Sequence, residues 1–561
     1  MKKHCASCLL FATASLSANI PALEEPTRDT QQILPAVATP EITRPIQTAT
    51  YLIEGLILVP GGVPLDNIKR EHGIHLELKE KEPELKEHLR SYLNHPLTPE
   101  ILNAIKQDVI SYYRKKGRYV AVVIPVQQVE DEVLIMQIFQ GILDQVQYIG
   151  QRYFNTGALA RGCTLKPGDP ITENSILDYV TWMNRNPFHQ MQVILSPGSI
   201  PGTSSVEFLS KERYIIRPFL GSDNTGYKLN NQARFYGGFS CGNMFYLGDI
   251  FAFQYTASPN FHTFQSFLAS YTSFLSWHHQ LNVFACYGVV YPNVTGFSVE
   301  GKNVQISARY QIPFRPLYGN FRSSATAGFD WKYITSAYFF VGNAAEAGVT
   351  PNQTINLTQF YAEYELLQKW PTDALTFKVN GYASLWKNWL PFQTTFDYNL
   401  QRPGSHVRYA YLQASIDNRY QFENGWVCHG VFRGQLASNT LPTSEQFGLG
   451  GADTVRGYYE QQFVADNAIC ANLELYTPNY SLFASLPNEL SFLAFFDYGW
   501  GQNYSYVSPQ FHWQQLMGIG SGVHYSIIPY MAAKLEYGFQ LRGIPQDHEL
   551  GRFHLSLNIS Y

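Results

Sequence analysis

The feature that most constrains the fold is a strict alternation of apolar and polar residues in the C-terminal part of the chain. From residue 533 to residue 542, Ala, Leu, Tyr, Phe and Leu alternate with Lys, Glu, Gly, Gln and Arg. Leu375, Phe377 and Val379 alternate in the same way with polar neighbours. Because successive side chains of a strand point to opposite faces, each segment has one face suited to lipid and one suited to a wet interior. From Arg213 onward the sequence therefore predicts a train of membrane-spanning strands.

A closed antiparallel β-barrel is the fold that such strands can adopt in a membrane. In hydrocarbon every backbone amide and carbonyl needs an internal partner, which a closed barrel supplies and an open sheet does not. Residues 213–561 allow about 14 to 18 strands at roughly 20 to 24 residues each, connections included. Aromatic residues reach 15% and charged residues only 15%, a composition that favours a barrel with aromatic girdles. Trp386, Trp389 and Tyr398 are interpreted as girdle residues.

The N-terminal residues have the pattern of an export signal. Lys2 and Lys3 precede an apolar stretch from Leu9 to Leu16, with small residues just after it, and this predicts a signal peptide over residues 1–18. Residues 19–50 hold five prolines and little apolar periodicity, which predicts an extended linker. No later window offers about 18 apolar residues without a charge, which argues against a helical membrane protein.

Between the linker and the barrel the sequence predicts two small α/β domains in tandem, over residues 51–141 and 142–212. In the first, Thr98 can cap a helix that Gly117 ends. The other elements expected in the first domain are a strand at 51–59, a charged helical run near 78–93, and strands at 119–126 and 133–139. The second domain repeats the plan, with a strand at 145–149, a helix at 173–184 and strands at 191–195 and 205–209.

Two short motifs place single charges in the predicted barrel. In the segment Phe447–Tyr458, Arg456 lies among the glycines Gly450, Gly451 and Gly457. Further along the chain Asp497 lies between aromatic and apolar residues in Phe495–Gly499. An arginine shielded inside a barrel needs a partner, and a carboxylate can bind a guanidinium through two charge-assisted hydrogen bonds. An arginine in solvent on an outer loop is the alternative interpretation.

The sequences Val455-Arg456-Gly457-Tyr458 and Phe495-Phe-Asp497-Tyr-Gly499 resemble the paired motifs of the two-partner secretion transporters of the hemolysin-activator type. These are outer-membrane barrels preceded by POTRA domains. The resemblance implies about sixteen strands, POTRA character for both α/β domains, and a loop folded into the lumen whose arginine pairs with the aspartate. The implied loop residues are Gly450, Gly451, Val455, Arg456, Gly457 and Tyr458, and the implied strand residues are Phe495, Asp497 and Gly499.

The same resemblance implies that the final alternating strand, ending on Tyr561, is the outer-membrane insertion signal. The implied function is capture of an unfolded exoprotein in the periplasm and its secretion through the barrel, including hemolysin secretion or activation. The implied partners are that polypeptide and outer-membrane lipid, and the implied state is a monomer. Many family members thread a helix from the N-terminus through the barrel, but the five prolines of residues 19–50 leave little room for one.

Two other functions stay open at this point. An assembly insertase of the same superfamily would share both motifs but typically carries more POTRA domains. A passive or gated channel would explain the barrel without needing the tandem domains.

Other classes of function have little support in the sequence. A net charge of -4 gives no basic footprint for nucleic acid. Ser521 has Ile519 where a nucleophile elbow requires glycine, so we expect no enzyme. The cysteines beyond the signal lack metal-binding spacing, and we expect neither metal nor cofactor; a single disulfide among them would suit an oxidising compartment. These cysteines are Cys163, Cys241, Cys286, Cys428 and Cys470.

Overall fold

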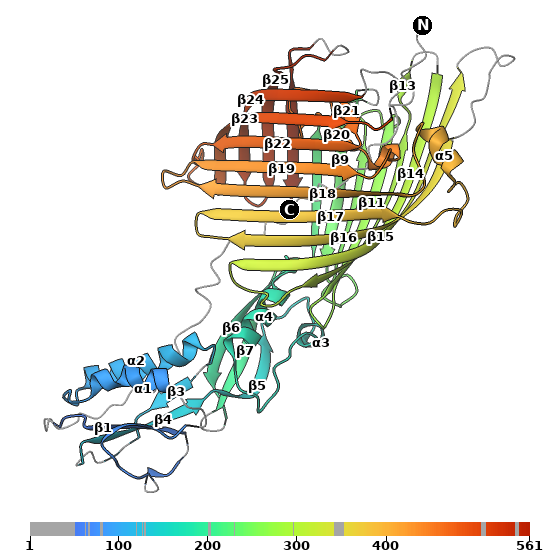
Figure 1. The fold of residues 1–561 in the computed structure, drawn as a ribbon. Helices are drawn as coiled ribbons and strands as arrows, with labels where there is room; N and C mark the ends of the chain where they lie inside the picture. The colour runs from blue at the N-terminus through green and yellow to red at the C-terminus, as the bar shows by residue number, and fades with distance from the viewer. Residues whose placement is uncertain are drawn as a thin grey trace. The chain divides into compact units, whose positions relative to one another are not determined.

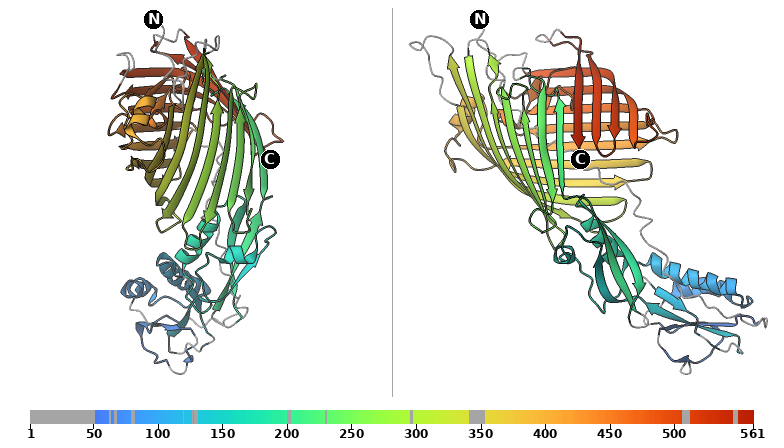
Figure 2. Two further views of the ribbon diagram at one scale, coloured as in Figure 1. Left: turned by 90° about the vertical axis from the view of Figure 1, so that its right-hand side faces the viewer. Right: turned by 180° about the vertical axis from the view of Figure 1, so that it is seen from behind.

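The computed structural model describes most of the chain from Tyr51 to Tyr561, in two compact units, residues 51–213 and 214–561 (Figures 1 and 2). The described ranges are 51–61, 63–65, 68–78, 82–118, 120–125, 127, 131–199, 203–228, 231–294, 297–340, 353–505, 512–544 and 549–561. The expected signal peptide, the proline-rich linker and the question of a plug helix lie outside these residues. Among the described helices, none combines the length and apolar character needed to cross a membrane.

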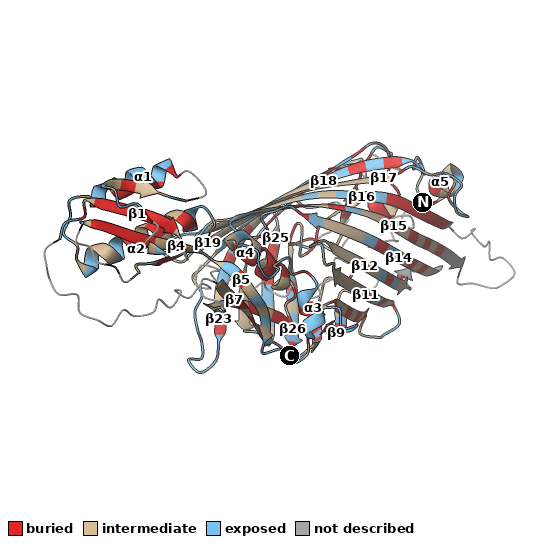
Figure 3. Cartoon of the chain, turned by 90° about the horizontal axis from the view of Figure 1, so that it is seen from below, coloured by how far each residue is buried: buried red, intermediate tan, exposed pale blue. Residues whose placement is uncertain are grey.

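The first α/β domain is a four-stranded sheet in the order β2-β1-β4-β3. Its strands are β1 (Gly55–Pro60), β2 (Gly73–Leu76), β3 (Val120–Val123) and β4 (Val133–Gln140), with β1 parallel to both neighbours. The helices are α1 (Pro83–Leu89), the 3-10 turn η3 (Arg90–Tyr92) and α2 (Pro99–Lys115). Thr98 accepts the amide of Ile101 and caps α2 as expected. The apolar residues of β1 and β4 form the core together with those of α1 and α2, and the buried residues are red in Figure 3.

Several elements of this domain differ from the expectation. The charged run near residues 78–93 forms α1 and η3 instead of one helix, because Pro83 fixes the start of α1 and the chain tightens at Arg90. The first strand begins at Gly55 instead of Tyr51. The four-residue strand β2 was not predicted, since so short a segment carries no measurable periodicity.

The second α/β domain has the sheet order β5-β7-β6. Its elements are β5 (Ile142–Ile149), α3 (Thr156–Ala160), α4 (Glu173–Met183), β6 (His189–Pro197) and β7 (Thr203–Glu212); α3 was not predicted. The Glu212 carboxylate at the end of β7 accepts the amides of Arg152 and Phe154 at 2.9 and 3.3 Å. This contact fixes the turn that leads into α3.

His189 makes the stability of the second α/β domain depend on pH. The imidazole is 3% exposed and lies against Phe154, and burial lowers the pKa of His189 to about 4. An unfolded histidine titrates near 6.5, so between these pH values the unfolded state binds more protons than the folded state. Stability should therefore be full above pH 6.5 and fall as the pH drops toward 4, by up to about 3 kcal/mol.

Urea unfolding of residues 51–213 at several pH values between 7.5 and 4.5 measures this dependence. His189→Leu, which cannot titrate, is the matched control, and the difference in pH slope between the two proteins isolates His189. Equal slopes would contradict the assignment.

The second unit is a closed antiparallel barrel of sixteen strands, and with the two α/β domains this confirms the predicted architecture (Figure 2). The strands are β8 (Ile216–Asp223), β9 (Arg234–Gly242), β10 (Ile250–Ala257), β11 (Phe264–Phe274), β12 (Gln280–Val290), β14 (Phe297–Pro313), β15 (Phe321–Phe340), β16 (Gln353–Lys369), β17 (Asp373–Ser384), β18 (Tyr409–Gln421), β19 (Val427–Ala437), β22 (Asn467–Tyr476), β23 (Asn488–Gln502), β24 (Trp513–Ile527), β25 (Met531–Gln540) and β26 (Gly551–Ser560). The two-residue strand β13 (Asn293–Val294) pairs with β14. Pairing of β26 with β8 closes the barrel.

Alternation along β25 places the two faces of the wall as predicted. Leu535 and Phe539 are exposed on the outer face, whereas Glu536 is buried on the inner face. Trp389 is exposed and clusters with Trp386. Tyr398 is not a girdle residue, which corrects the expectation: it is fully buried in the short helix α5 (Thr395–Gln401), where its hydroxyl donates to the carbonyl of Asn356.

Candidate functional site

The loop between β19 and β22, residues 438–466, carries the Arg456 motif. It contains the 3-10 turn η4 (Thr443–Glu445) and a small hairpin of β20 (Phe447–Leu449) and β21 (Phe463–Ala465). Both hairpin strands lie against β23, and Figure 1 shows them beside β22 to β24. Leu449, Val455 and Tyr458 are buried in one apolar cluster with Leu516 of β24. We call residues 438–466 the inner loop.

The structure brings Arg456 of the inner loop and Asp497 of β23 into direct contact. The Arg456 Nε and Nη2 donate to Asp497 Oδ2 and Oδ1, each at 2.8 Å, and the backbone amide of Arg456 adds a third bond at 3.0 Å. The Arg456 side chain is 3% exposed and that of Asp497 is fully buried. This is a bidentate pair, which fixes the orientation of the Arg456 side chain as well as its position.

Two further carboxylates face the same guanidinium. Arg456 Nη1 lies 2.8 Å from Glu474 of β22 and 3.1 Å from Glu536 of β25. The guanidinium carbon also lies 3.5 Å from the centre of the Phe495 ring. One cation therefore faces three acids on three strands. Glu474 also contacts His429, Glu536 contacts His524, and Asp497 accepts the side-chain amide of Asn472.

Glycines in the wall give the inner loop room to approach. A Cβ at Gly518 would lie 2.2 Å from the carbonyl oxygen of Arg456, and one at Gly538 would lie 2.5 Å from the amide nitrogen of Gly457. A Cβ at Gly499 would lie 2.8 Å from a Val455 methyl. A side chain at Gly518 or Gly538 would displace the loop backbone. A side chain at Gly499 would push Val455 away, so glycine at this position lets Val455 pack against the strand.

The loop glycines of the motif adopt backbone conformations that other residues disfavour. Gly450, Gly451 and Gly457 have φ of 101°, 105° and 98°. The amide of Gly457 donates to His554 of β26 at 3.1 Å. Tyr458 then donates its hydroxyl proton to the carbonyl of Arg542 at 2.6 Å and accepts the amide of Met517 at 3.2 Å.

A second anchor of the inner loop, Glu445, was not predicted. Its carboxylate lies 2.7 Å from the ammonium of Lys332 on β15 and accepts the hydroxyl of Tyr411 on β18 at 2.7 Å. Gln359 of β16 donates to it at 3.1 Å. The side chains of Glu445 and Lys332 are 1% and 8% exposed.

The end of the inner loop is held by Asp466. This buried carboxylate accepts both terminal nitrogens of Arg402, at 2.5 and 2.9 Å, and the amide of Tyr504 at 2.9 Å. Arg402 belongs to the loop between β17 and β18, and Tyr504 to the loop after β23. Asp466 therefore joins three neighbouring loops at one end of the barrel.

Tyr561 is not part of this cluster. It follows β26 directly, is 77% exposed, and its backbone amide donates to the carbonyl of Pro218 on β8 at 3.2 Å. The structure thus places it at the strand pair that closes the barrel.

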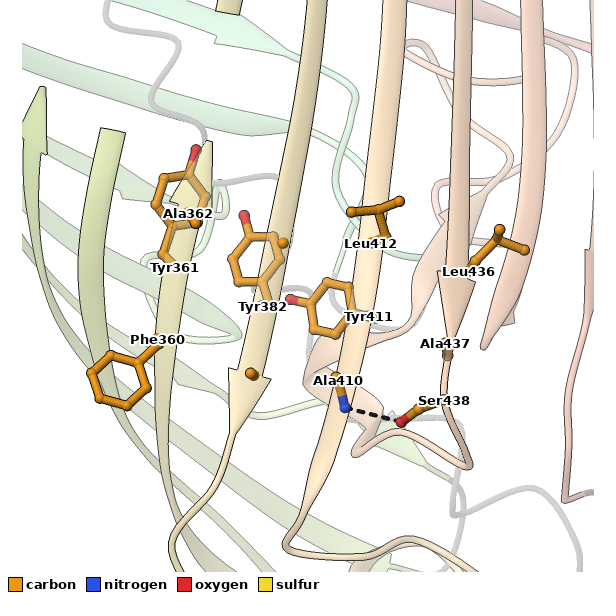
Figure 4. Close-up of a pocket in the computed structure, with 12 residues that line it drawn as sticks. Phe360, Tyr361, Ala362, Tyr382, Ala410, Tyr411, Leu412, Leu436, Ala437 and Ser438 are labelled. Atoms are coloured by element: carbon orange, nitrogen blue, oxygen red, sulfur yellow. Dashed lines mark hydrogen bonds between the residues drawn. The ribbon is translucent and has the colours of Figure 1, made fainter. Parts of the chain in front are cut away.

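A shallow hollow of about 530 Å³ lies over β16 to β19 (Figure 4). Small residues, Gly381, Ala383 and Ala410, line it together with the exposed Leu412 and Leu436. It is a mainly apolar depression of the outer face.

Among the described residues no cluster of His, Cys, Asp and Glu has the arrangement of a metal site. The five described cysteines are free thiols. The arrangement holds the inner loop against the lumen wall by ion pairs.

Comparison with known proteins agrees with this geometry. The family model described as "Haemolysin secretion/activation protein ShlB/FhaC/HecB" matches residues 202–525. The outer membrane transporter CdiB of Dickeya dadantii (strain 3937) is 25% identical over 395 residues, which is 66% of this chain. The match covers 65% of that relative, slightly less than two thirds of its own length.

Solved structures share the fold. CdiB from Escherichia coli superposes with a TM-score of 0.67 over 93% of each chain, at 15% identity. CdiB from Acinetobacter baumannii gives 0.61 over 95% of each chain, also at 15% identity. BamA from Haemophilus ducreyi lacking POTRA domains 1–3 gives 0.54 over 91% of this chain and all of that one, at 12% identity.

Proposed function

The chain belongs to the haemolysin secretion/activation family ShlB/FhaC/HecB of outer-membrane two-partner secretion transporters, and from this we propose that it secretes an unfolded partner polypeptide across the outer membrane. The observation that carries the proposal is the buried contact of Arg456 with Asp497, which holds the inner loop in the lumen of a sixteen-strand barrel. A barrel that only had to pass small solutes would have no need of the two α/β domains that precede it.

We propose that the two α/β domains, over residues 51–141 and 142–212, act as POTRA domains that capture the partner in the periplasm. Within the described residues, the edge strands of these sheets are β2 and β3 in the first domain and β5 and β6 in the second. The start of β5 is already bonded on its outer side to residues 168–171, which leaves β2, β3 and β6 as the candidate edges. An extended segment of the partner can add to such an edge through backbone hydrogen bonds, with little dependence on sequence.

Movement through the barrel is then driven by the partner itself. Neither nucleotide nor an ion gradient is available at the outer membrane, so folding of the partner outside makes its return unfavourable. The inner loop has to shift from its resting contacts to let the polypeptide pass. Haemolysin activation during export, a monomeric state and the insertion role of Tyr561 belong to the same proposal.

Quantitative proteomics of medium, periplasm and outer membrane tests the function. Cells with and without the chain are compared, and loss of one or a few large polypeptides from the medium without it would support dedicated secretion and identify the cargo. General depletion of other outer-membrane barrels would instead indicate an insertase, the activity suggested by the likeness to BamA. No change in any fraction would favour a channel.

A further inference from the structure

The inner wall of the barrel is divided by charge. Arg234, at the start of β9, is the single charged residue in the four consecutive strands β9 to β12, all of whose residues are described. On these strands Phe235, Phe267 and Tyr287 are exposed on the outer face. Besides Arg234, the alternate, inward positions are uncharged: Tyr236, Gly238, Ser240, Gly242, Ile250, Ala252, Gln254, Thr256, Phe264, Ser266, Leu268, Ser270, Thr272, Phe274, Gln280, Asn282, Phe284, Cys286, Gly288 and Val290. We call this surface the neutral wall.

The inward positions of the other strands are rich in charge. They include Asp330, Lys332, Glu363, Glu365, Lys378, Asp417, Arg433, Glu474, Asp497, Glu536 and Arg552. The inner loop uses this side: Glu445 binds β15, β16 and β18, and Arg456 binds β22, β23 and β25. We call the inward positions of these other strands the charged wall. The inner loop is fixed to the charged wall.

Several uncharged polar side chains of the neutral wall bond to one another. Gln254 donates to Thr256 at 3.0 Å, and Asn282 donates to Thr272 at 2.8 Å. Cross-strand register keeps these groups side by side, since Thr256 faces Ser266 and Thr272 faces Asn282. Hydroxyls and amides of this kind can exchange one partner for another without leaving a charge unpaired.

Resting on the proposed function, we propose that the secreted polypeptide passes in extended form along the neutral wall of β9 to β12. An extended chain presents an amide and a carbonyl at every residue, and these need hydrogen-bonding partners that are easily exchanged. Passage requires contacts weak enough to be left again. Charged groups would retain or repel parts of the polypeptide according to their own charge, whereas the neutral wall is indifferent to it.

Photocrosslinking from defined wall positions tests the path. The photoreactive probe benzoylphenylalanine replaces one residue at a time in the full chain in secreting cells: Ser270 on the neutral wall, Ala269 beside it on the outer face, or Thr376 on the charged wall. Secretion by each variant is measured first, and light-dependent adducts with the secreted polypeptide are then identified by mass spectrometry. We expect an adduct from the probe at position 270 and no adduct from the probes at positions 269 and 376.

The outcomes separate the path from the function. Secretion with adducts from position 376 instead of 270, equally from both, or from none of the positions would overturn the path and leave the proposed function standing. Absence of any polypeptide whose secretion depends on the native chain would overturn the function itself, and the path with it.

Discussion

Arg456→Ala is expected to abolish secretion while the barrel stays inserted in the outer membrane at its normal level. The substitution leaves the fully buried Asp497, and Glu474 and Glu536, whose side chains are 14% and 10% exposed, without the guanidinium that faces them. Removing one partner of a buried ion pair costs about 3 to 5 kcal/mol, enough to release the loop from the wall. The measurement is the amount of cargo in the medium per inserted barrel.

Matched variants separate this effect from a general loss of charge. Arg408→Ala removes an exposed arginine from the loop between β17 and β18 and should secrete normally. Asp497→Asn keeps the shape of the partner and leaves Arg456 with Glu474 and Glu536. Secretion by Asp497→Asn should therefore lie between that of Arg456→Ala and that of Arg408→Ala. Normal secretion by both Arg456→Ala and Asp497→Ala would refute a working role for the pair.

Glu445→Ala is expected to cause the second largest defect, with a loss of secretion close to that of Arg456→Ala. It strips Lys332 of its carboxylate in a position where the ammonium is 8% exposed, and it also leaves the Tyr411 hydroxyl without its acceptor. The uncompensated charge again costs about 3 kcal/mol or more. A second measurement is the conductance of the purified barrel in planar bilayers. The conductance should rise because the part of the inner loop around Glu445 is no longer held to the wall.

A double-mutant cycle identifies the cause. If the defect comes from the stranded ammonium, adding Lys332→Met to Glu445→Ala should recover part of the secretion, because the double variant buries no unpaired charge. Glu423→Ala, which removes an exposed carboxylate from the turn between β18 and β19, is the control. Additive losses in the double variant would show that Glu445 and Lys332 act independently.

The fold was predictable because its signals are local. Alternation within β25 or β17 marks a strand and its two faces over a few residues, and the cap of Thr98 marks the start of α2 in the same way. Elements without such signals were missed, as β2 and α3 show: four or five residues are too few to establish a period. Tyr398 was misplaced because an aromatic near tryptophans has the same composition whether it faces lipid or a loop core.

The candidate site was predictable only where a motif spans it. Arg456 and Asp497 could be paired from the sequence because each sits in a recognisable run of glycines or aromatics. Glu445 has no such setting, and its partner Lys332 lies 113 residues away on a strand with no distinctive pattern. The second anchor depends on how the loop crosses the lumen, which is a property of the tertiary structure and has no local signature.

The two anchors have a geometric consequence for the barrel. Strand number and tilt determine the circumference of a closed sheet, but a ring of given circumference can be round or flattened. A single loop bonded to β15, β16 and β18 through Glu445 and to β22, β23 and β25 through Arg456 fixes the chord between those two arcs of the wall. The cross-section is thus set from within, and releasing either anchor would change the shape of the lumen without adding or removing a strand.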